Sequence, residues 1–344
     1  MKTTADVLVV GAGISGLIAA GELARDRRDV IVLDKGRGVG GRMSTRRHAG
    51  GRFDHGAQFI TVRSQTFETI MEQWVAAGVA ELWSHGFADG QTGDGSIAGS
   101  PASAHMPARD GHPRYRGVPG MSAIPKFVAT EQHSLDVHLG AQATAVTASD
   151  DTVRVTPADG PVFHAGTVIL TPPVPQTLTL LASGGVALEP TEQTALSGLE
   201  YHPCLVLLTM ANGRLELPEP GVLRNPSGTI AWVADNSRKG VTNRGPALTV
   251  HFTADFSREH YEDEPESLLQ LLISEAQTAL SFEPVEPQLK KWRFSQPERA
   301  RSDGALQLSH HPNVILAGDI FSGARVEGAV LSGLAAAEQV RLLG

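Results

Sequence analysis

The feature that most constrains the fold is a glycine-rich turn between two apolar segments near the start of the chain. Residues 5–10 (ADVLVV) are an apolar run with β-branched residues, and they lead directly into GAGISG at residues 11–16. A stretch of helical character follows, and a second apolar run, residues 30–33, ends in Asp34. This order of strand, turn, helix, strand and terminal acid predicts a βαβ unit that binds a dinucleotide.

The three glycines of this turn have separate steric roles. Gly11 permits the tight turn, Gly13 lets the backbone approach a pyrophosphate, and Gly16 lets the helix and the strand pack closely. The N-terminus of the following helix offers free N–H groups and a positive dipole end to the phosphates. Asp34 lies 18 residues after Gly16, where a carboxylate can accept hydrogen bonds from a ribose diol.

Two further segments identify the dinucleotide. Gly40-Gly41-Arg42 follow the acid, and this tail resembles that of amine-oxidase flavoproteins, in which it lies along FAD. Near the end of the chain, residues 313–319 predict a strand that ends in Asp319, and RVEGA at residues 325–329 opens a helix. The N-terminus of that helix can stabilise negative charge on a reduced flavin ring. We therefore expect FAD as the cofactor.

A covalent link to the flavin is not expected. The one cysteine of the chain, Cys204, lies in a predicted strand that is far in sequence from both FAD segments. A single cysteine also excludes an internal disulfide and a CxxC redox pair, which fits a cytoplasmic location.

The resemblance implies an α/β fold with two domains. The first is a Rossmann-like FAD-binding domain of the glutathione-reductase and amine-oxidase type, and the second is an α+β substrate domain built on an antiparallel sheet. A chain of 344 residues is long for one hydrophobic core. We expect a discontinuous FAD-binding domain at 1–64, 134–173 and 291–344, with the substrate domain at 65–133 and 174–290.

Apolar periodicity predicts most of the remaining elements. A core-facing helix is expected over residues 65–83, and a long loop over residues 84–120, which are rich in Gly, Pro, Ser and Ala. Arg109, Arg114 and Arg116 of that loop either reach an anionic substrate or are simply solvated. Strands are expected at 136–139, 142–147, 152–156, 167–171, 205–208, 230–233 and 247–252, and a helix at 265–280.

Charge and composition exclude several classes of protein. The composition, 41% apolar and 19% charged, is that of an ordinary globular chain. The net charge of −8 argues against nonspecific binding to nucleic acid or to an anionic membrane. No apolar run reaches the roughly 18 residues of a membrane span. We expect no nucleic-acid or membrane partner, and either a monomer or a homodimer.

Several motifs together resemble the renalase family and its bacterial members. They are VVGAGISG, DKGRGVGGRMSTRR, DHGAQFIT, PGMSAI, DNSRK, KWRFSQP and AGDxxxGxRVEGAxLSG, and they are spread over nearly the whole chain. The narrower ones, DHGAQF at 54–59 and KWRFSQP at 291–297, contribute most to this resemblance. In related flavoproteins the segment around Gly56 to Gln58 runs beside the flavin ring.

The resemblance implies an oxidase that converts 2- or 6-dihydro isomers of NAD(P) to NAD(P)⁺. Hydride passes to flavin N5, and O₂ is reduced to H₂O₂. Aromatisation of the pyridine ring drives hydride loss, so the reaction needs close alignment and no general base. No catalytic side chain is therefore assigned, and the thirteen histidines form no metal-ligand pattern such as HExxH. No metal is expected.

Two other functions remain open. Amine oxidases of the same fold usually place an aromatic residue two positions before the Glu of their EGA motif, where this chain has Arg325. A cation there would repel a protonated amine and favour an anionic substrate. A flavin-binding protein without turnover is the third alternative.

We also expect specific contacts with the substrate and the cofactor. Trp292 either lines a ring face or is a core residue, and Arg238 and Arg293 either bind a substrate phosphate or form surface ion pairs. The expected substrate contacts are Trp232, Asn236, Arg238, Trp292, Arg293 and Arg325. The expected cofactor contacts are Gly11, Gly13, Ile14, Ser15, Gly16, Asp34, Lys35, Gly41, Arg42, Met43, Gly56, Ala57, Gln58, Phe59, Ala143, Gly318, Asp319, Val326, Glu327 and Ala329.

Overall fold

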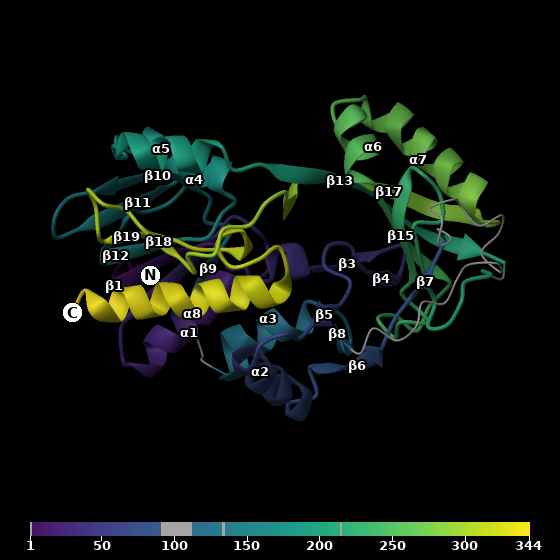
Figure 1. Ribbon diagram of the computed structural model, residues 1–344, viewed down its shortest axis with the longest axis horizontal. Helices are drawn as coiled ribbons and strands as arrows, with labels where there is room; N and C mark the ends of the chain where they lie inside the picture. The colour runs from purple at the N-terminus through teal and green to yellow at the C-terminus, as the bar shows by residue number, and fades with distance from the viewer. Residues whose placement is uncertain (1, 91–111, 133–134, 214) are drawn as a thin grey trace. The chain divides into compact units, whose positions relative to one another are not determined.

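The computed structural model in Figure 1 describes residues 2–90, 112–132, 135–213 and 215–344. The chain divides into two compact units, each built from separate stretches of sequence. The first unit comprises Met1–Arg42, Ile124–Tyr201 and Gln296–Gly344, and the second comprises Met43–Ala123 and His202–Ser295.

These units differ in extent from the predicted domains at four places: residues 43–64 and 291–295 fall in the second unit, and residues 124–132 and 174–201 fall in the first. Residues 43–64 belong to the second unit, because the hairpin of β3 (Thr45–His48) and β4 (Gly51–Asp54) packs against β16 (Ala247–Phe252) there. Residues 174–201 belong to the first unit, where the helix after Pro173 packs on β10 (Ala143–Ala148). Neither packing partner is adjacent in sequence.

The first unit is organised around parallel strands. Their spatial order is β9, β2, β1, β12, β19, and all neighbouring pairs are parallel. Residues of β1, β2 and β12 are mostly buried and rich in Val, Leu and Ile, as expected for strands that are covered on both faces. The bounds are β1 Thr4–Val10, β2 Val30–Asp34, β9 Asp136–Leu139, β12 Phe163–Leu170 and β19 Val314–Leu316.

Antiparallel strands extend this sheet beyond β12. Strand β11 (Val153–Pro157) pairs with residues 163–165 of β12, and β19 pairs with residues 168–170. Because β1 occupies the other edge of β12, β11 and β19 share one edge. The sheet ends in β10 (Ala143–Ala148) beside β11 and in β18 (Leu306–Gln307) beside β19.

Two helices pack side by side in this unit. Helix α1 (Ile14–Arg25) follows the glycine-rich turn, and α8 (Val326–Leu342) lies against it (Figure 1). A Cβ at Gly333 of α8 would overlap the backbone oxygen of Ser15 in α1, so this close approach requires glycine. The other helical segments of the unit are α3 Ala123–Phe127, η3 Val128–Gln132, α4 Val174–Ser183, α5 Pro190–Ser197 and η4 Asp319–Phe321.

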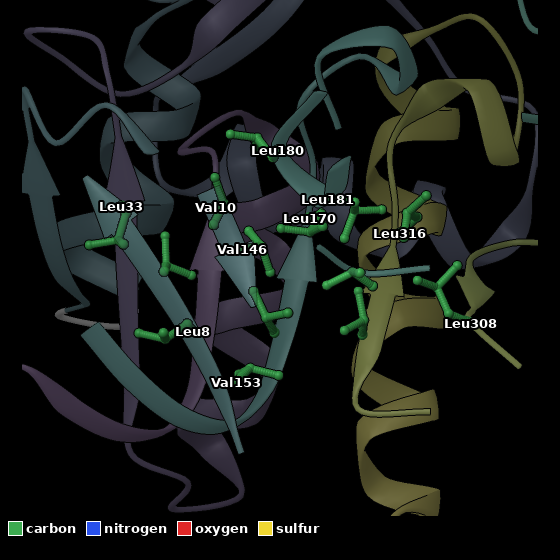
Figure 2. Close-up of a cluster of buried hydrophobic side chains, with 14 of the residues drawn as sticks. Leu8, Val10, Leu33, Val146, Val153, Leu170, Leu180, Leu181, Leu308 and Leu316 are labelled. Carbon is green, nitrogen blue, oxygen red and sulfur yellow. The ribbon is translucent and has the colours of Figure 1, made fainter. Parts of the chain in front are cut away.

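One hydrophobic core cluster of the first unit lies on the sheet face away from α1. Figure 2 shows Leu8, Leu33, Val146, Leu170 and Leu181 converging there from β1, β2, β10, β12 and α4. All five are almost completely buried. The alternation of side chains along a strand separates this face from the one that contacts α1.

The second unit contains a sheet with helices on one face. The strand order is β17, β13, β16, β15, β14, β7. Helix α7 (Pro265–Ala279) buries Leu268, Leu272 and Ala276 against this sheet, a spacing of one helical face. The other bounds are α6 Ala254–Glu259, β7 Ala88–Asp89, β13 Tyr201–Asn212, β14 Val222–Arg224, β15 Ile230–Asp235 and β17 Glu283–Pro297.

The helix predicted over residues 65–83 is too long. Helix α2 ends at Ala76, and Gly78 adopts a left-handed φ of +71° directly after it. Residues 80–84 then form β6, which is held by its pairing with β8 (Arg114–Gly117), a strand that is not adjacent in sequence. The bounds are η1 Gly41–Met43, β5 Ile60–Thr61, α2 Gln65–Ala76, β6 Ala80–Ser84 and β8 Arg114–Gly117, and β8 pairs with both β5 and β6.

Other sequence predictions are confirmed. Strands form at β9, β10, β11, β13, β15 and β16, and α7 and α8 begin where predicted. Strand β12 starts at Phe163, four residues before the predicted 167. Arg109 lies outside the described residues. Within the part of the chain that the structure describes, no helix is long and apolar enough to cross a bilayer.

We predict that Leu8→Ala destabilises the protein far more than Leu342→Ala does. Leu8 is 0% exposed and Leu342 is 79% exposed, and the chemical change is the same. The core substitution should lower the free energy of unfolding by about 2–5 kcal/mol because it leaves a cavity, whereas the surface one should change it by less than about 0.5 kcal/mol. Urea unfolding followed by circular dichroism measures both. Equal losses would contradict the position of the core.

Candidate functional site

The glycine-rich turn of the first unit allows close backbone contacts. Gly11 has a φ of +108°, and a Cβ there would overlap the Oγ1 of Thr171. The Thr171 hydroxyl donates to the carbonyl of Val10, at 2.9 Å. A Cβ at Gly16 would overlap the carbonyl oxygen of Gly11. The turn is therefore restricted to glycine at both positions by contacts within the protein.

Gly13 differs from these two because its side-chain position is open. A Cβ there would have no neighbour within 4 Å, which leaves the approach to the start of α1 clear for a pyrophosphate. Ser15, in the first turn of α1, has a buried Oγ without a partner among the described residues. These features fit a dinucleotide phosphate at the N-terminus of α1.

The GGR tail lies against this turn. Gly13 and Gly40 form an isolated bridge, and the N–H of Gly40 donates to the carbonyl of Ala12, at 2.8 Å. Gly41 lies next to Gly13, since a Cβ on Gly41 would be 3.6 Å from the Gly13 Cα. The two glycine-rich segments therefore form one continuous backbone surface.

Asp34 ties both glycine-rich segments to the end of β2. Its Oδ2 accepts from the N–H of Ala12 and its Oδ1 from the N–H of Gly36, each at 2.6 Å. Each carboxylate oxygen can accept a further hydrogen bond, so the predicted contact with a ribose remains possible and stays a prediction.

Arg42 joins the tail to the C-terminal segment. Its Nη1 and Nη2 donate to the two carboxylate oxygens of Asp319 at 2.7 and 2.6 Å, a bidentate pair between residues 277 positions apart. Burial opposes the charge, but the charge and hydrogen bonds of Asp319 outweigh it and raise the pKa of Arg42. Burial raises the pKa of nearby Tyr201 to about 12, so this phenol stays neutral.

The C-terminal segment positions the start of α8. Gly318 has a φ of +142°, and its N–H donates to the Oγ of Ser332 at 2.8 Å. Arg325 is exposed at the N-cap and its side chain does not cap the helix, while Glu327 is buried in the first turn. The N-terminal N–H groups of α8 and its positive dipole end are therefore available to an anionic ligand.

The other predicted cofactor contacts of this unit are more scattered. Lys35 is exposed after β2, Ala143 is half-buried on β10, and Val326 and Ala329 are half-buried in the first turn of α8. Met43 is buried, but it belongs to the second unit. The contacts of these residues with FAD stay predictions.

In the second unit a buried ion pair fixes the DHGAQF segment. The Nζ of Lys239 lies 2.9 Å from Oδ2 of Asp54, and both side chains are 0% exposed. The other oxygen of Asp54 accepts from the hydroxyl of Thr45 at 2.6 Å and from the N–H of Met121 at 2.9 Å. A buried charge pair needs such additional hydrogen bonds, so Asp54 connects three separate segments.

The backbone of Asp54 is held as firmly as its side chain. Its N–H donates to Oδ1 of Asn236 at 3.0 Å, and its carbonyl accepts from Thr249 Oγ1 at 3.0 Å and Gln58 Nε2 at 2.7 Å. The Asn236 amide also donates to the carbonyl of Ala247, at 3.0 Å. Asn236, predicted as a substrate contact, thus fixes the turn that carries Gly56, Ala57 and Gln58.

Trp292 lies directly on this turn. Its ring stacks on His55 with centroids 5.1 Å apart, and its Nε1 donates to the His55 carbonyl at 2.8 Å. Burial lowers the pKa of His55 to about 3, and burial together with the charge of Lys239 lowers the pKa of His251 to about 4. Both imidazoles are therefore neutral near pH 7.

The remaining predicted substrate contacts are distributed differently. Trp232 stacks on Phe59 with centroids 5.4 Å apart. Arg238 pairs with Glu219 at 2.6 Å, and Arg293 pairs with Glu262 at 2.7 Å. The two arginines thus form separate ion pairs, which is one of the two roles that the sequence left open. Their contact with a substrate phosphate stays a prediction.

Sequence reasoning missed Lys239, Thr249 and His251. Lys239 is part of the DNSRK motif, but a lysine in a polar turn is usually solvated. The signal that was available is local: Lys239 follows closely after β15, in the connection between two strongly apolar strands, β15 and β16. A lysine at the end of a buried strand pair has little access to solvent.

Comparison with known families assigns the chain. Residues 79–341 match the profile described as flavin containing amine oxidoreductase, and residues 9–74 match the one described as an NAD(P)-binding Rossmann-like domain. The chain belongs to the flavin-containing amine oxidoreductase family. Its cofactor is FAD, as expected from the glycine-rich segments.

One curated relative is similar to this chain over a short segment. A flavin-containing monoamine oxidase by name, AofH of Mycobacterium tuberculosis, is 51% identical over 57 residues. That match spans 17% of this chain and 13% of the relative.

Solved structures match over the full length. A structure named as a protoporphyrinogen oxidase, from Exiguobacterium sp. 255-15, has a TM-score of 0.74 at 14% identity and covers 100% of both chains. A variant of putrescine oxidase has a TM-score of 0.72 at 15% identity, with 99% of both chains covered. At such identities the likeness shows the fold, and it confirms the predicted FAD-binding architecture with a second domain.

We predict that Gly13→Ala weakens FAD binding without unfolding the protein. The added methyl group meets no protein atom within 4 Å, but it occupies the space through which a pyrophosphate would approach. The dissociation constant for FAD should rise on the order of tenfold or more. Gly38→Ala is the matched control, because its methyl group also meets nothing within 4 Å. Unchanged FAD affinity in Gly13→Ala, measured by titration of the apoprotein, would contradict this position of the phosphates.

We predict that stability falls in acid as His55 and His251 become protonated. Their folded pKa values, about 3 and about 4, lie below the unfolded value of about 6.5. The unfolded state therefore binds more protons below pH 6.5, and each histidine lowers the free energy of unfolding by up to about 1.4 kcal/mol per pH unit down to its folded pKa.

Urea midpoints between pH 7 and pH 4 test this sign. His251→Gln should reduce the loss of stability on acidification, and His85→Gln, a change at an exposed histidine of the same unit, should leave it unchanged. Identical pH profiles for His251→Gln and the unmodified protein would disprove a neutral buried imidazole at this position.

Proposed function

We propose that this flavoprotein is an oxidase that converts 2- or 6-dihydro isomers of NAD(P) to NAD(P)⁺. Bound FAD supplies a hydride acceptor at N5 and passes the electrons to O₂, which is released as H₂O₂. Hydride loss restores the aromatic pyridine ring, so the protein needs only to bind and align the dihydropyridine ring.

One observation carries the proposal. The two narrow motifs that resemble the renalase family are in direct contact, because Trp292 of KWRFSQP stacks on His55 of DHGAQF and donates to its carbonyl at 2.8 Å. The contact joins residues 237 positions apart. These motifs therefore form one local structure beside the Gly56 to Gln58 segment, which supports a shared function rather than two unrelated likenesses.

The titration state of this region supports the same chemistry. A general base works best with a pKa near the operating pH, and His55 and His251 have pKa values lowered to about 3 and about 4. They are weak bases that stay neutral. A reaction that releases a hydride without proton abstraction fits such surroundings.

The local charge favours an anionic substrate. Lys239 and Arg114 lie over aromatic rings of the second unit, and Arg116 lies close to Lys239. Asp54 neutralises Lys239 and Glu81 neutralises Arg116, so Arg114 is the cation of this group that attracts a phosphate-bearing dinucleotide and repels a protonated amine.

An amine oxidase is the second candidate. It is favoured by the description of the matching family and by the names of relatives such as monoamine oxidase AofH and putrescine oxidase. It is disfavoured by Arg325, which stands where amine oxidases usually have an aromatic residue, and by Arg114, which lies over the rings of Phe59 and Phe87.

We predict that 2- or 6-dihydro isomers of NAD(P) bleach the flavin absorbance in the absence of air. The 4-dihydro isomer serves as the matched control and should react at least about tenfold more slowly, because its hydride comes from a different ring carbon. Admitting O₂ should restore the spectrum and form H₂O₂.

Two other results would overturn the proposal. Bleaching by primary amines and by none of the dihydro isomers would assign the protein as an amine oxidase. A flavin that neither the isomers nor the amines reduce would instead indicate a binding protein without this turnover.

A further inference from the structure

A cluster of aromatic rings in the second unit lies next to the DHGAQF segment. Phe87 contacts Phe59, Trp83 and Trp232, with ring centroids 5.1, 4.9 and 5.0 Å away. Phe87 and Trp232 are buried, while Phe59 and Trp83 are half-buried. The cluster therefore reaches from the interior of the unit towards its surface. We refer to these four residues as the aromatic cluster.

The polar atoms of this cluster lack partners. The indole Nε1 of Trp83 and of Trp232 are buried, and neither has a hydrogen-bond partner among the described residues. Trp232 is only 8% exposed. Buried donors in native proteins are nearly always paired, and a buried indole N–H usually finds an acceptor. The indole Nε1 of Trp74, a fully enclosed residue of α2, is also unpaired among these residues, so an unpaired indole does not by itself mark a site. Two unpaired indoles in one cluster that reaches the surface indicate an acceptor from outside the described residues.

One cation adjoins these rings, and a second lies beside it. The Nζ of Lys239 lies 5.0 Å from the centroid of Trp83. Arg116 lies close to this lysine, because a Cβ on Gly240, the next residue, would be 2.7 Å from its Nη1. That Nη1 is also buried and unpartnered among the described residues. Every unpaired group named here is a donor.

The nearby acids do not satisfy these donors. The carboxylate of Asp54 is bound by Lys239, Thr45 and Met121, and the carboxylate of Glu81 is bound by Nη2 of Arg116. The group that fits is consequently planar, for stacking on aromatic faces, and carries acceptor oxygens for the indole and guanidinium N–H groups.

We propose that the aromatic cluster, together with Arg116, forms a subsite for a planar heteroaromatic ring that carries a carboxamide or carboxylate group. The ring stacks on the exposed side of the cluster, at Phe59 and Trp83. The two oxygens of a carboxylate can accept from all three donors, the indole N–H groups of Trp83 and Trp232 and Nη1 of Arg116, whereas a single carboxamide oxygen can accept from two of them. This inference rests on the proposed function in taking the ring to be the pyridine of the substrate, and it assigns Trp83 and Arg116 as specificity-determining residues.

The subsite can be tested by binding alone. The chain has four tryptophans, so the ¹⁵N-tryptophan-labelled flavoprotein gives few indole N–H signals, and single Trp→Phe variants assign them. Titration with pyridine-3-carboxamide or pyridine-3-carboxylate should shift the signals of Trp83 and Trp232 with one saturating curve. Trp74 is the internal control, because it is 0% exposed on α2 and makes its ring contact with Phe67.

Conservative variants separate the hydrogen bonds from the stacking. Trp83→Phe and Trp232→Phe keep an aromatic ring and remove the N–H, so each should weaken carboxamide binding about three- to tenfold. Neither should weaken the binding of unsubstituted pyridine, which has no exocyclic oxygen. Trp74→Phe should change neither affinity, and the flavin spectrum verifies that each variant is folded.

The probes also distinguish the sources of the acceptor. A response to both ring compounds supports the subsite. The compound that binds more tightly shows whether the subsite prefers a carboxamide or a carboxylate group. A response to inorganic phosphate alone, tighter binding of benzylammonium than of the carboxamide, or no movement of the Trp83 and Trp232 signals with any probe would overturn it.

The binding test of the subsite and the flavin-bleaching test of the proposed function can fail separately. If the two indoles respond but no dihydro isomer bleaches the flavin, the proposed function fails and the subsite stands. If the isomers bleach the flavin and the indoles do not respond, the subsite fails and the proposed function stands.

Discussion

The buried ion pair between Asp54 and Lys239 organises the second unit. Taking both charges out of water is costly, and this cost is offset only because Asp54 also accepts hydrogen bonds from Thr45 and Met121. Its backbone is held by Asn236. The hairpin β3–β4, the segment before α3 and the β15–β16 turn thus meet at one carboxylate, so the orientation of the DHGAQF segment depends on this pair.

The first unit depends on close backbone approach instead of buried charge. At Gly11, Gly16 and Gly333 a single methyl group would overlap atoms of neighbouring segments, whereas Gly13 remains open. The bidentate pair of Arg42 with Asp319 then joins the start and the end of the chain. Gly13, Arg42 and Asp319, predicted FAD contacts that are distant in sequence, are thus held together within the first unit.

The two units differ in ways that suit the proposed chemistry. The first unit provides a fixed backbone surface and helix N-termini for an anionic dinucleotide, and the second provides neutral imidazoles, aromatic faces and donors. A reaction driven by aromatisation requires a fixed ring orientation more than proton transfer. The indole N–H groups of Trp83 and Trp232 are donors without a partner among the described residues. They would favour a ring that carries an acceptor oxygen over an amine, which carries donors.

The sequence by itself determined the βαβ unit, the GGR tail and the opening of α8, because a tight turn, a phosphate approach and a helix start are local and leave a fixed spacing of glycines and acids. It did not determine the end of α2, the membership of residues 43–64, or the burial of Lys239. Asp54 and Asn236 are 182 residues apart, and nothing in either segment specifies the other. Only tertiary packing decides which charge is removed from water, because burial depends on all the segments that converge on a residue, whereas a turn depends on its own few residues.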